Sequence, residues 1–237
     1  MTVNRASIWL ETFWQRLYPP LCALCGAPGA TGLDLCSRCR ADLPPLGSAC
    51  LCCARPLSIP GICGACQQQA PPQDRTLSAF RYAPPLDHLI LQLKFHGKLH
   101  LAQLLGALTA EHLEHRAHPL PECIIPVPLH PTRLRERGFN QALELAQPIA
   151  ARLQIPIHYQ GIYRKRNTTS QSELPRQERK RNIRGVFALQ GPLTARHVAI
   201  MDDVFTTGHT VGELTKVLRR GGVQIVEVWT CARALPF

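Results

Sequence analysis

After residue 73, the chain alternates between strand-like runs and stretches in which apolar residues have helical spacing. Strand-like runs occur at 76–82, 123–128, 198–201 and 223–229. Several of them are apolar enough for strands that are buried on both faces of a sheet. Apolar residues recur at intervals of three and four, as on one helical face, over 86–93, 102–115, 139–153 and 211–218. Strands that alternate with helices predict an α/β fold built on a parallel sheet.

Two further segments precede this pattern. Apolar residues that fall near one helical face, and so predict a helix within 1–21, are Ile8, Trp9, Phe13, Trp14 and Leu17. Such a helix either packs on its own protein or docks a partner. The polar, proline-bearing stretch 67–73 is typical of a linker. We therefore expect an N-terminal helix at 1–21, a cysteine-rich module at 22–66 and an α/β domain at 74–237.

Nine of the eleven cysteines precede residue 67. Eight of these form four Cys-x-x-Cys pairs, namely Cys22 and Cys25, Cys36 and Cys39, Cys50 and Cys53, and Cys63 and Cys66. Two such pairs complete a tetrahedral Cys₄ shell around a metal ion, with metal–sulfur distances of about 2.3 Å. The pattern favours zinc over an iron–sulfur cluster or redox-active dithiols. Four cysteine ligands leave no coordination position open, so we expect two structural Zn²⁺ ions.

The spacing leaves the pairing of these ligands open. Sequential pairing assigns the first four cysteines to one ion and the last four to the other, whereas an interleaved arrangement alternates the pairs. Cys52 lies between two predicted ligands and has no assigned role. Cys123 and Cys231 lie in apolar, strand-like runs, where cysteine usually serves as a small core residue.

Composition excludes two broad classes of protein. The 237 residues are 45% hydrophobic, enough for a sizeable core, which excludes a disordered chain. No apolar run approaches the ~18 residues of a membrane span. Arg5 is the only early cation and Glu11 interrupts the apolar residues, so the N-terminus does not read as a secretory signal. We expect a cytoplasmic protein, in a compartment where structural disulfides are rare.

The charge is strongly basic and unevenly distributed. Lys and Arg number 27 against 16 Asp and Glu, which gives a net charge of +11. Residues 130–185 hold twelve basic and four acidic side chains, so +8 of this charge lies in less than a quarter of the chain. Such a charge favours partners that carry phosphate groups.

The segment 198–210 carries the most specific chemistry. A buried strand leads to Asp202 and Asp203. A turn follows and precedes a helix; its residues are Thr206, Thr207, Gly208, His209 and Thr210. A hydroxyl- and glycine-rich turn at a helix N-terminus presents backbone N–H groups to a phosphate. Ionised carboxylates accept hydrogen bonds, so the aspartates suit the 2′,3′-diol of a ribose. The segment predicts a sugar-phosphate site; the alternative is a surface turn with two solvated aspartates.

Several segments together resemble motifs of known protein families. Residues 198–210 resemble the phosphoribosyl diphosphate (PRPP) motif of type I phosphoribosyltransferases. Residues 126–130 (Pro-Val-Pro-Leu-His) followed by 133–141 resemble the ComF/GntX signature. So does the later order of Arg164, Arg166, Thr168, Gln171, Arg179, Asn182, Gly185 and Phe187. The double Cys-x-x-Cys module ahead of residues 93–95 is also arranged as in that family, and the resemblance runs from about residue 22 to residue 233.

The resemblance implies a type I phosphoribosyltransferase-like domain, with helices on both faces of its sheet, behind an N-terminal zinc ribbon. Asp202 and Asp203 would then be catalytic residues that hold the ribose hydroxyls, and residues 206–210 would hold the 5′-phosphate. Arg137 and Gly138, with Arg133 and Arg135 nearby, match the position of the diphosphate loop, where arginines supply charge-assisted bonds. Mg²⁺ would bind the diphosphate, whose departure from the sugar leaves a positive charge that the aspartates stabilise. A basic turn on the surface is the alternative for the arginines.

The basic segment 163–184 has eight basic and two acidic side chains and predicts a mobile loop. In type I enzymes a loop at this place closes over the ligand, and Arg164, Arg166, Gln171 and Arg179 are its candidate contacts to PRPP or DNA. A solvated basic surface is the alternative. Lys94 and His96 precede Gly97, where a helix is expected to end, and we interpret both as cations at the helix C-terminus.

Three functions are compatible with the sequence. The first is an enzyme, in DNA uptake during natural transformation or in nucleotide salvage, that transfers phosphoribose from PRPP to an acceptor. The second is a protein that handles single-stranded DNA together with DNA-uptake or recombination proteins. The third is a regulator that binds PRPP without transfer. Of the three, we favour a PRPP-binding, phosphoribosyltransferase-like domain that serves DNA uptake or nucleotide salvage.

Overall fold

The computed structural model describes residues 20–30, 32–167 and 184–235. The helix predicted within 1–21 falls almost entirely outside these ranges, as do the candidate contacts Gln171 and Arg179. Two short helices, α2 (Ser37–Ala41) and α3 (Gly64–Gln68), belong to the cysteine-rich module.

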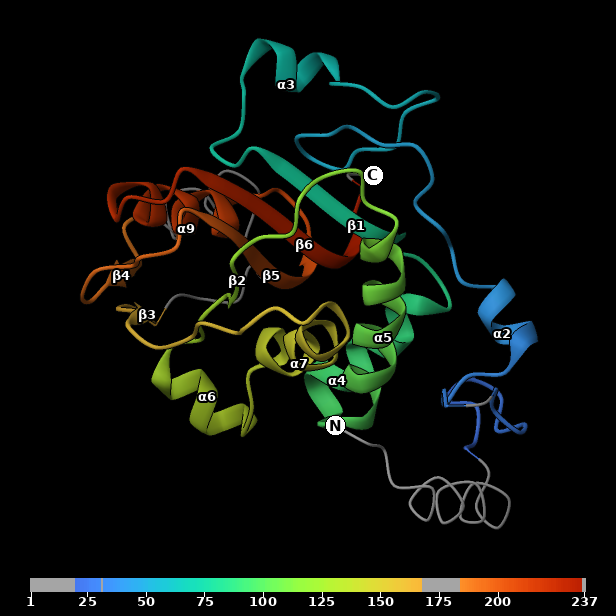
Figure 1. Cartoon of the computed structure of the whole chain (residues 1–237). Coiled ribbons are helices and arrows are strands. Elements are labelled where there is room, and N and C mark those ends of the chain that lie inside the picture. The colour runs from blue at the N-terminus through green and yellow to red at the C-terminus, as the bar shows by residue number, and fades with distance from the viewer. Residues whose placement is uncertain (1–19, 31, 168–183, 236–237) are drawn as a thin grey trace, which may run out of the picture.

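A four-stranded parallel sheet forms the centre of the larger domain (Figure 1). Its strands, in spatial order, are β1 (Arg75–Arg81), β6 (Ile225–Arg233), β5 (His197–Phe205) and β2 (Cys123–Pro126). Each adjacent pair runs parallel. The sheet confirms the α/β prediction, and the carboxyl ends of all four strands meet at one edge, where ligands of such folds bind.

Helices cover both faces of the sheet. One face packs against α4 (Leu86–His96), α5 (His100–Glu114) and α7 (Gln141–Leu153), in a core that includes Met201 and Trp229. The other face packs against α9 (His209–Arg220), whose Leu214 and Leu218 share a core with Ile200. Burial on both faces explains the apolar runs in the sequence. Among the described helices, none has the length and apolar character needed to cross a bilayer.

The elements differ from the prediction at three places. β5 continues to Phe205 because its register with β6 extends to the pair Phe205 and Arg233, so both aspartates lie within the strand. The predicted diphosphate loop contains a helix, α6 (Pro131–Arg137), which starts with a proline and a capping bond from the Thr132 N–H to His130 Nδ1. An unpredicted antiparallel pair consists of β3 (Ile162–Arg164) and β4 (Phe187–Leu189).

The cysteine-rich module packs against the edge of the sheet at β1. The backbone N–H of Arg81 donates to the carbonyl of Pro44 at 2.9 Å, and that of Thr76 donates to the carbonyl of Leu51 at 2.9 Å. These bonds satisfy backbone groups of an edge strand that would otherwise face solvent. The module therefore covers the β1 edge of the sheet in addition to forming the cysteine clusters.

Candidate functional site

Two Cys₄ clusters lie in the module, and each consists of two consecutive Cys-x-x-Cys pairs. The first cluster comprises Cys22, Cys25, Cys36 and Cys39, and the second comprises Cys50, Cys53, Cys63 and Cys66. Within each cluster all sulfur atoms lie within 4.8 Å of one another. The structure therefore selects sequential pairing over the interleaved arrangement.

The geometry of both clusters fits zinc. The Sγ atoms of Cys25 and Cys36 are 3.8 Å apart, and those of Cys53 and Cys63 are 3.7 Å apart. A tetrahedron with metal–sulfur bonds of about 2.3 Å has edges of about 3.8 Å. A backbone N–H of Cys63 also donates to Cys50 Sγ at 3.3 Å, a bond that supports a thiolate. These are two Cys₄ zinc-ribbon sites, and their closed ligand sets indicate structural metal.

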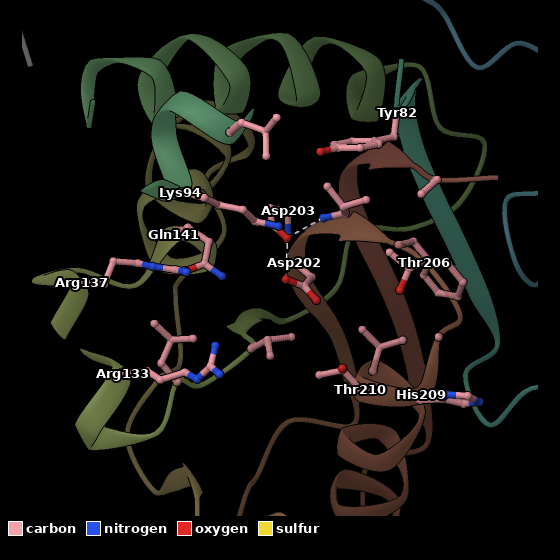
Figure 2. Close-up of a pocket in the computed structure, with 18 of the residues that line it drawn as sticks. Tyr82, Lys94, Arg133, Arg137, Gln141, Asp202, Asp203, Thr206, His209 and Thr210 are labelled. Carbon is pink, nitrogen blue, oxygen red and sulfur yellow. Dashed lines mark hydrogen bonds and ion pairs between the residues drawn. The ribbon is translucent and has the colours of Figure 1, made fainter. Parts of the chain in front are cut away.

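A cleft of about 340 Å³ opens at the carboxyl ends of the strands (Figure 2). Polar residues that line it are Lys94, Arg133, Arg137, Gln141, Arg164, Asp202, Asp203, Thr206, His209 and Thr210. They come from α4, α6, α7, β3, β5, the loop before α9 and the first turn of α9. The cleft therefore brings the predicted phosphate loop and the predicted diphosphate segment to opposite sides of one space.

The two aspartates have different surroundings. Asp203 is 4% exposed, and its Oδ1 accepts the backbone N–H of Val204 at 2.7 Å. Asp202 is partly buried, and its Oδ1 accepts the N–H of Asp203 at 2.9 Å. Burial raises the pKa of Asp202 to about 6, although Lys94 and Arg164 favour the ionised form. Because successive side chains alternate along a strand, Asp202 faces the cleft and Asp203 faces α4.

Lys94 is the partner of Asp203, which corrects its interpretation as a cation at a helix end. Its Nζ lies 2.5 Å from Oδ2 of Asp203, and the two residues approach each other across the cleft wall in Figure 2. Burial lowers the pKa of Lys94 to about 8, against the attraction of Asp202. α4 does end at His96, with Gly97 in the left-handed conformation, as predicted. Lys94 nevertheless points into the site.

The loop at 206–210 leads directly into α9. Gly208 has φ +77° and caps α9, whose N-terminus therefore opens on the cleft. Thr207 Oγ1 lies 3.1 Å from Nδ1 of His209. In Figure 2 the ring of His209 points away from the aspartates, so it does not narrow the space beside them. Gly208, His209 and Thr210 line the cleft, and the phosphate site at this loop stays a prediction.

The signature at 137–141 divides into residues that line the cleft and residues that support the fold. Arg137 lines the cleft, and its Nη1 donates to Oε1 of Gln141 at 2.5 Å. Gly138 has φ +82° and ends α6. Phe139 is a core residue, as predicted, and the Asn140 side chain caps α7 by accepting the Ala142 N–H at 3.0 Å. Burial and the charge of Arg133 lower the pKa of Arg137. A bound anion would reduce the repulsion between these two like charges.

The basic segment splits in a way that the sequence does not reveal. Arg164 is partly buried, lines the cleft and lies 5.9 Å from the centroid of the Phe187 ring. Lys165 and Arg166 are exposed. Arg164 therefore belongs with the cleft, whereas its two neighbours face solvent.

Sequence reasoning missed Lys94, Gln141 and Tyr82 as cleft residues. A faint signal exists for Lys94, because it shares with Leu91 and Phe95 a face of α4 opposite the buried stripe of Leu86, Leu89 and Leu93. Leu91 and Phe95 are 40% and 65% exposed, respectively. A second, partly apolar and exposed face on a helix indicates that this face lines a binding groove or an interface.

Known proteins match both the cysteine-rich module and the α/β domain. Residues 13–67 match the double zinc ribbon domain family. The DNA utilization protein YhgH of Salmonella typhi is 39% identical over 223 residues, which cover 92% of this chain and 98% of that protein. Competence protein F of Haemophilus influenzae is 35% identical, with 84% of this chain and 90% of that protein covered.

A more distant relative and one solved structure were also found. Competence protein ComFC of Bacillus subtilis is 26% identical over 211 residues, with 84% of each chain covered. The structure of glutamine PRPP amidotransferase from B. subtilis, complexed with ADP and GMP, aligns with a TM-score of 0.35 and 18% identity. That alignment covers 54% of this chain and 25% of the amidotransferase chain.

Proposed function

Since this chain belongs to the ComF/GntX family of competence and DNA utilization proteins, we propose that it binds PRPP with Mg²⁺ in the cleft and serves DNA uptake or utilisation. Nucleotide salvage is the other process that fits a protein with such a site. The proposal places the protein in the cytoplasm, where eleven cysteines stay reduced.

One observation carries the PRPP proposal. Asp202 at the end of β5, the loop 206–210 and the N-terminus of α9 follow one another around the cleft, and Arg137 faces them from α6. A phosphate at the loop would meet the N–H groups and positive end of α9. An anion beside Arg133 and Arg137 would relieve the repulsion between these two arginines. PRPP carries phosphate groups at both ends of a ribose, and its diol suits the carboxylate of Asp202 in between.

Mg²⁺ fits this site as a companion of the diphosphate. Among the described residues that line the cleft, Asp202 and Asp203 are the only carboxylates, and Lys94 already pairs with Asp203. Mg²⁺ prefers oxygen ligands and keeps several waters, so a diphosphate with Asp202 nearby is sufficient to hold it. The ion would neutralise charge on the leaving diphosphate. In a transfer reaction Asp202 and Asp203 would stabilise the positive charge that develops on the sugar.

Calorimetry with PRPP and MgCl₂ on the full chain tests the proposal. The double variant Asp202→Asn, Asp203→Asn keeps the shape of both side chains and removes the charged acceptors. We expect its affinity for PRPP to fall at least about tenfold, because a hydrogen bond to a charged group contributes about 1.5–3 kcal/mol. The variant Asp42→Asn removes one exposed carboxylate of the module and serves as the control. Equal PRPP affinity in parent and double variant would contradict the proposal.

A second function, binding of single-stranded DNA, is favoured by the exposed cations beside the cleft. Arg135 on α6 and Lys165 and Arg166 after β3 are exposed and point to a basic surface outside the cleft. Basic side chains bind the phosphate backbone without reading sequence. We propose that Arg164 contacts PRPP, whereas Lys165 and Arg166 contact DNA. Gln171 and Arg179, the other candidate contacts to PRPP or DNA, lie outside the described residues, and their role stays a prediction.

A further inference from the structure

Arg233, the last residue of β6, is tied to the strand end that leads into the phosphate loop. It is 5% exposed, and its Nη1 donates to the carbonyls of Phe205 at 2.8 Å and Thr206 at 2.5 Å. A third bond from the same nitrogen goes to the carbonyl of Ala234. One buried guanidinium thus fixes two successive carbonyls at the point where β5 becomes the loop.

The same guanidinium supports the loop through the ring of Phe205. Its central carbon lies 4.8 Å from the centroid of that ring, within the range of a cation–π contact. On the loop side, a Cβ added to Gly208 would lie only 2.7 Å from Cζ of Phe205. The ring is therefore packed closely against Gly208, the cap of α9. Arg233 holds the loop at its carbonyls and, through Phe205, at its glycine.

Arg233 also interacts with Cys53 of the second Cys₄ site. Cys53, one of its ligands, packs against the core cluster that contains Phe205 and Val211. Burial lowers the pKa of Arg233, and the neighbouring Cys53 thiolate opposes this shift. The carbonyl of Cys52 accepts bonds from Thr76 Oγ1 at 2.7 Å and Gln73 Nε2 at 3.1 Å. These bonds hold the cysteine turn against β1 at Thr76, which pairs with Val228 of β6.

The first Cys₄ site has a different environment. Its ligands Cys22, Cys36 and Cys39 pack against the core on the opposite face of the sheet. α2 lies beside α5 in Figure 1, and its Arg40 pairs with Glu111 of that helix. The two sites thus offer an internal comparison. Cys53 of the second site packs against the cluster that contains Phe205 and Val211, which flank the loop, whereas the first site belongs to the cluster against which Val204 packs.

We propose that the second Cys₄ site positions the phosphate loop through Arg233, so that metal at this site, unlike metal at the first, controls the order of residues 204–210. Metal binding supplies folding energy to a small cysteine module, so loss of the ion loosens the turn at Cys50 and Cys53. Arg233 then loses its contact with Cys53 and becomes accessible to water. Water competes for the hydrogen bonds that its guanidinium donates to the Phe205 and Thr206 carbonyls. The part of this inference that concerns PRPP rests on the proposed function; the part that concerns loop order does not.

Hydrogen exchange of the full-length protein, without ligand, tests the coupling. The variants are Cys53→Ser at the second site, Cys25→Ser at the first site, and Arg233→Met and Arg233→Lys. Zinc per chain is measured on each sample. We expect Arg233→Met to keep both ions and yet to exchange at 204–210 at least about tenfold faster, since local opening sets exchange rates. Cys53→Ser should show the same acceleration with one ion lost, and Arg233→Lys should restore part of the protection.

A control variant and a ligand-binding measurement separate failure of the coupling from failure of the proposed function. Cys25→Ser should lose one ion and leave exchange at 204–210 unchanged. Parent-like exchange at 204–210 in Arg233→Met would overturn the proposal even if Cys53→Ser fails to fold, and so would equal acceleration in Cys25→Ser and Cys53→Ser. Calorimetry with PRPP and MgCl₂ is run in parallel. If the parent does not bind this probe while exchange follows the expected pattern, the coupling stands and the proposed function falls.

Discussion

The ammonium of Lys94 on α4 lies 2.5 Å from the Oδ2 atom of Asp203 on β5, and this pair joins the helical layer to the carboxyl end of the sheet. The Asp203 side chain is 5% exposed and that of Lys94 is 23% exposed. A buried carboxylate without a partner is costly, so the pairing with Lys94 stabilises Asp203 beneath the cleft. Asp202 remains available to a ligand.

We predict that Lys94→Met destabilises the protein by roughly 3 kcal/mol, because it leaves the carboxylate of Asp203 buried and unpaired. The double variant Lys94→Met, Asp203→Asn should recover most of this loss, since the amide carries no charge. Urea unfolding of the parent, both single variants and the double variant gives the coupling free energy. Additive losses in the double variant would show that the two side chains do not interact.

The raised pKa of Asp202 predicts a pH dependence with a defined sign. Its folded-state pKa of about 6 exceeds the model-compound value of 3.8, so the folded protein binds this proton more tightly than the unfolded chain does. Asp202 therefore lowers stability as pH rises from 4 through 6, and Asp202→Asn should remove this contribution. The melting temperature of Asp202→Asn relative to the parent should be higher at pH 7.5 than at pH 4. A difference that is constant with pH would contradict the shift.

PRPP affinity should show the opposite trend. The ionised carboxylate of Asp202 accepts the ribose hydroxyls, so binding should weaken as pH falls through about 6, where the carboxylate takes up its proton. Calorimetry between pH 5 and pH 7.5 in the parent and in Asp202→Asn measures this. The slope should be smaller in the variant, in which residue 202 no longer titrates. Equal slopes in both proteins would assign the pH dependence to another group.

Local sequence was sufficient to predict the loop but not its surroundings. The order of strand, aspartates, loop and helix at 198–210 is contiguous, so its geometry follows from short-range rules. Lys94 lies more than a hundred residues before Asp203, and the pair depends on how α4 packs on the sheet. The choice between sequential and interleaved cysteine pairing is likewise set by the tertiary fold. α6 was missed because a seven-residue helix with three arginines and no buried side chain has no hydrophobic period.

The two Cys₄ clusters predict two zinc ions per chain. Elemental analysis of Cys36→Ser and of Cys63→Ser should each give about one ion, because a tetrahedral site with three cysteines loses much of its affinity. Cys52→Ser is the matched control, since Cys52 lies between two ligands of the second cluster but belongs to neither cluster. It should retain both ions. A parent protein that is folded and holds fewer than two ions would contradict the assignment.

A buried charge network at the opposite end of β6 should govern stability without affecting the cleft. Oε1 of Glu227 lies 3.3 Å from Nη2 of Arg116 and 3.2 Å from Nε2 of His197, and Oε2 accepts the Trp229 indole N–H at 2.9 Å. The side chains of Arg116 and Glu227 are 3% and 1% exposed. Arg116→Met should therefore cost roughly 3 kcal/mol in urea unfolding. PRPP affinity should be unchanged, and a parallel loss of affinity would refute this separation.

Salt dependence distinguishes a DNA-binding surface at Lys165 and Arg166 from a merely solvated one. If both side chains contact phosphates of single-stranded DNA, the double variant Lys165→Gln, Arg166→Gln should reduce the slope of log affinity against log salt by about 0.7 for each contact. Sequence preference should not change, because phosphate contacts do not read bases. Arg152→Gln removes a cation that pairs with Glu111 and Glu114 and should leave the slope intact.

Because Lys165 and Arg166 are exposed and Arg164 lines the cleft, the PRPP affinity of the double variant should match that of the parent. An equal slope in the double variant and the parent would remove these two residues from the DNA-binding surface, and a parent that binds no single-stranded DNA at low salt would remove the surface itself.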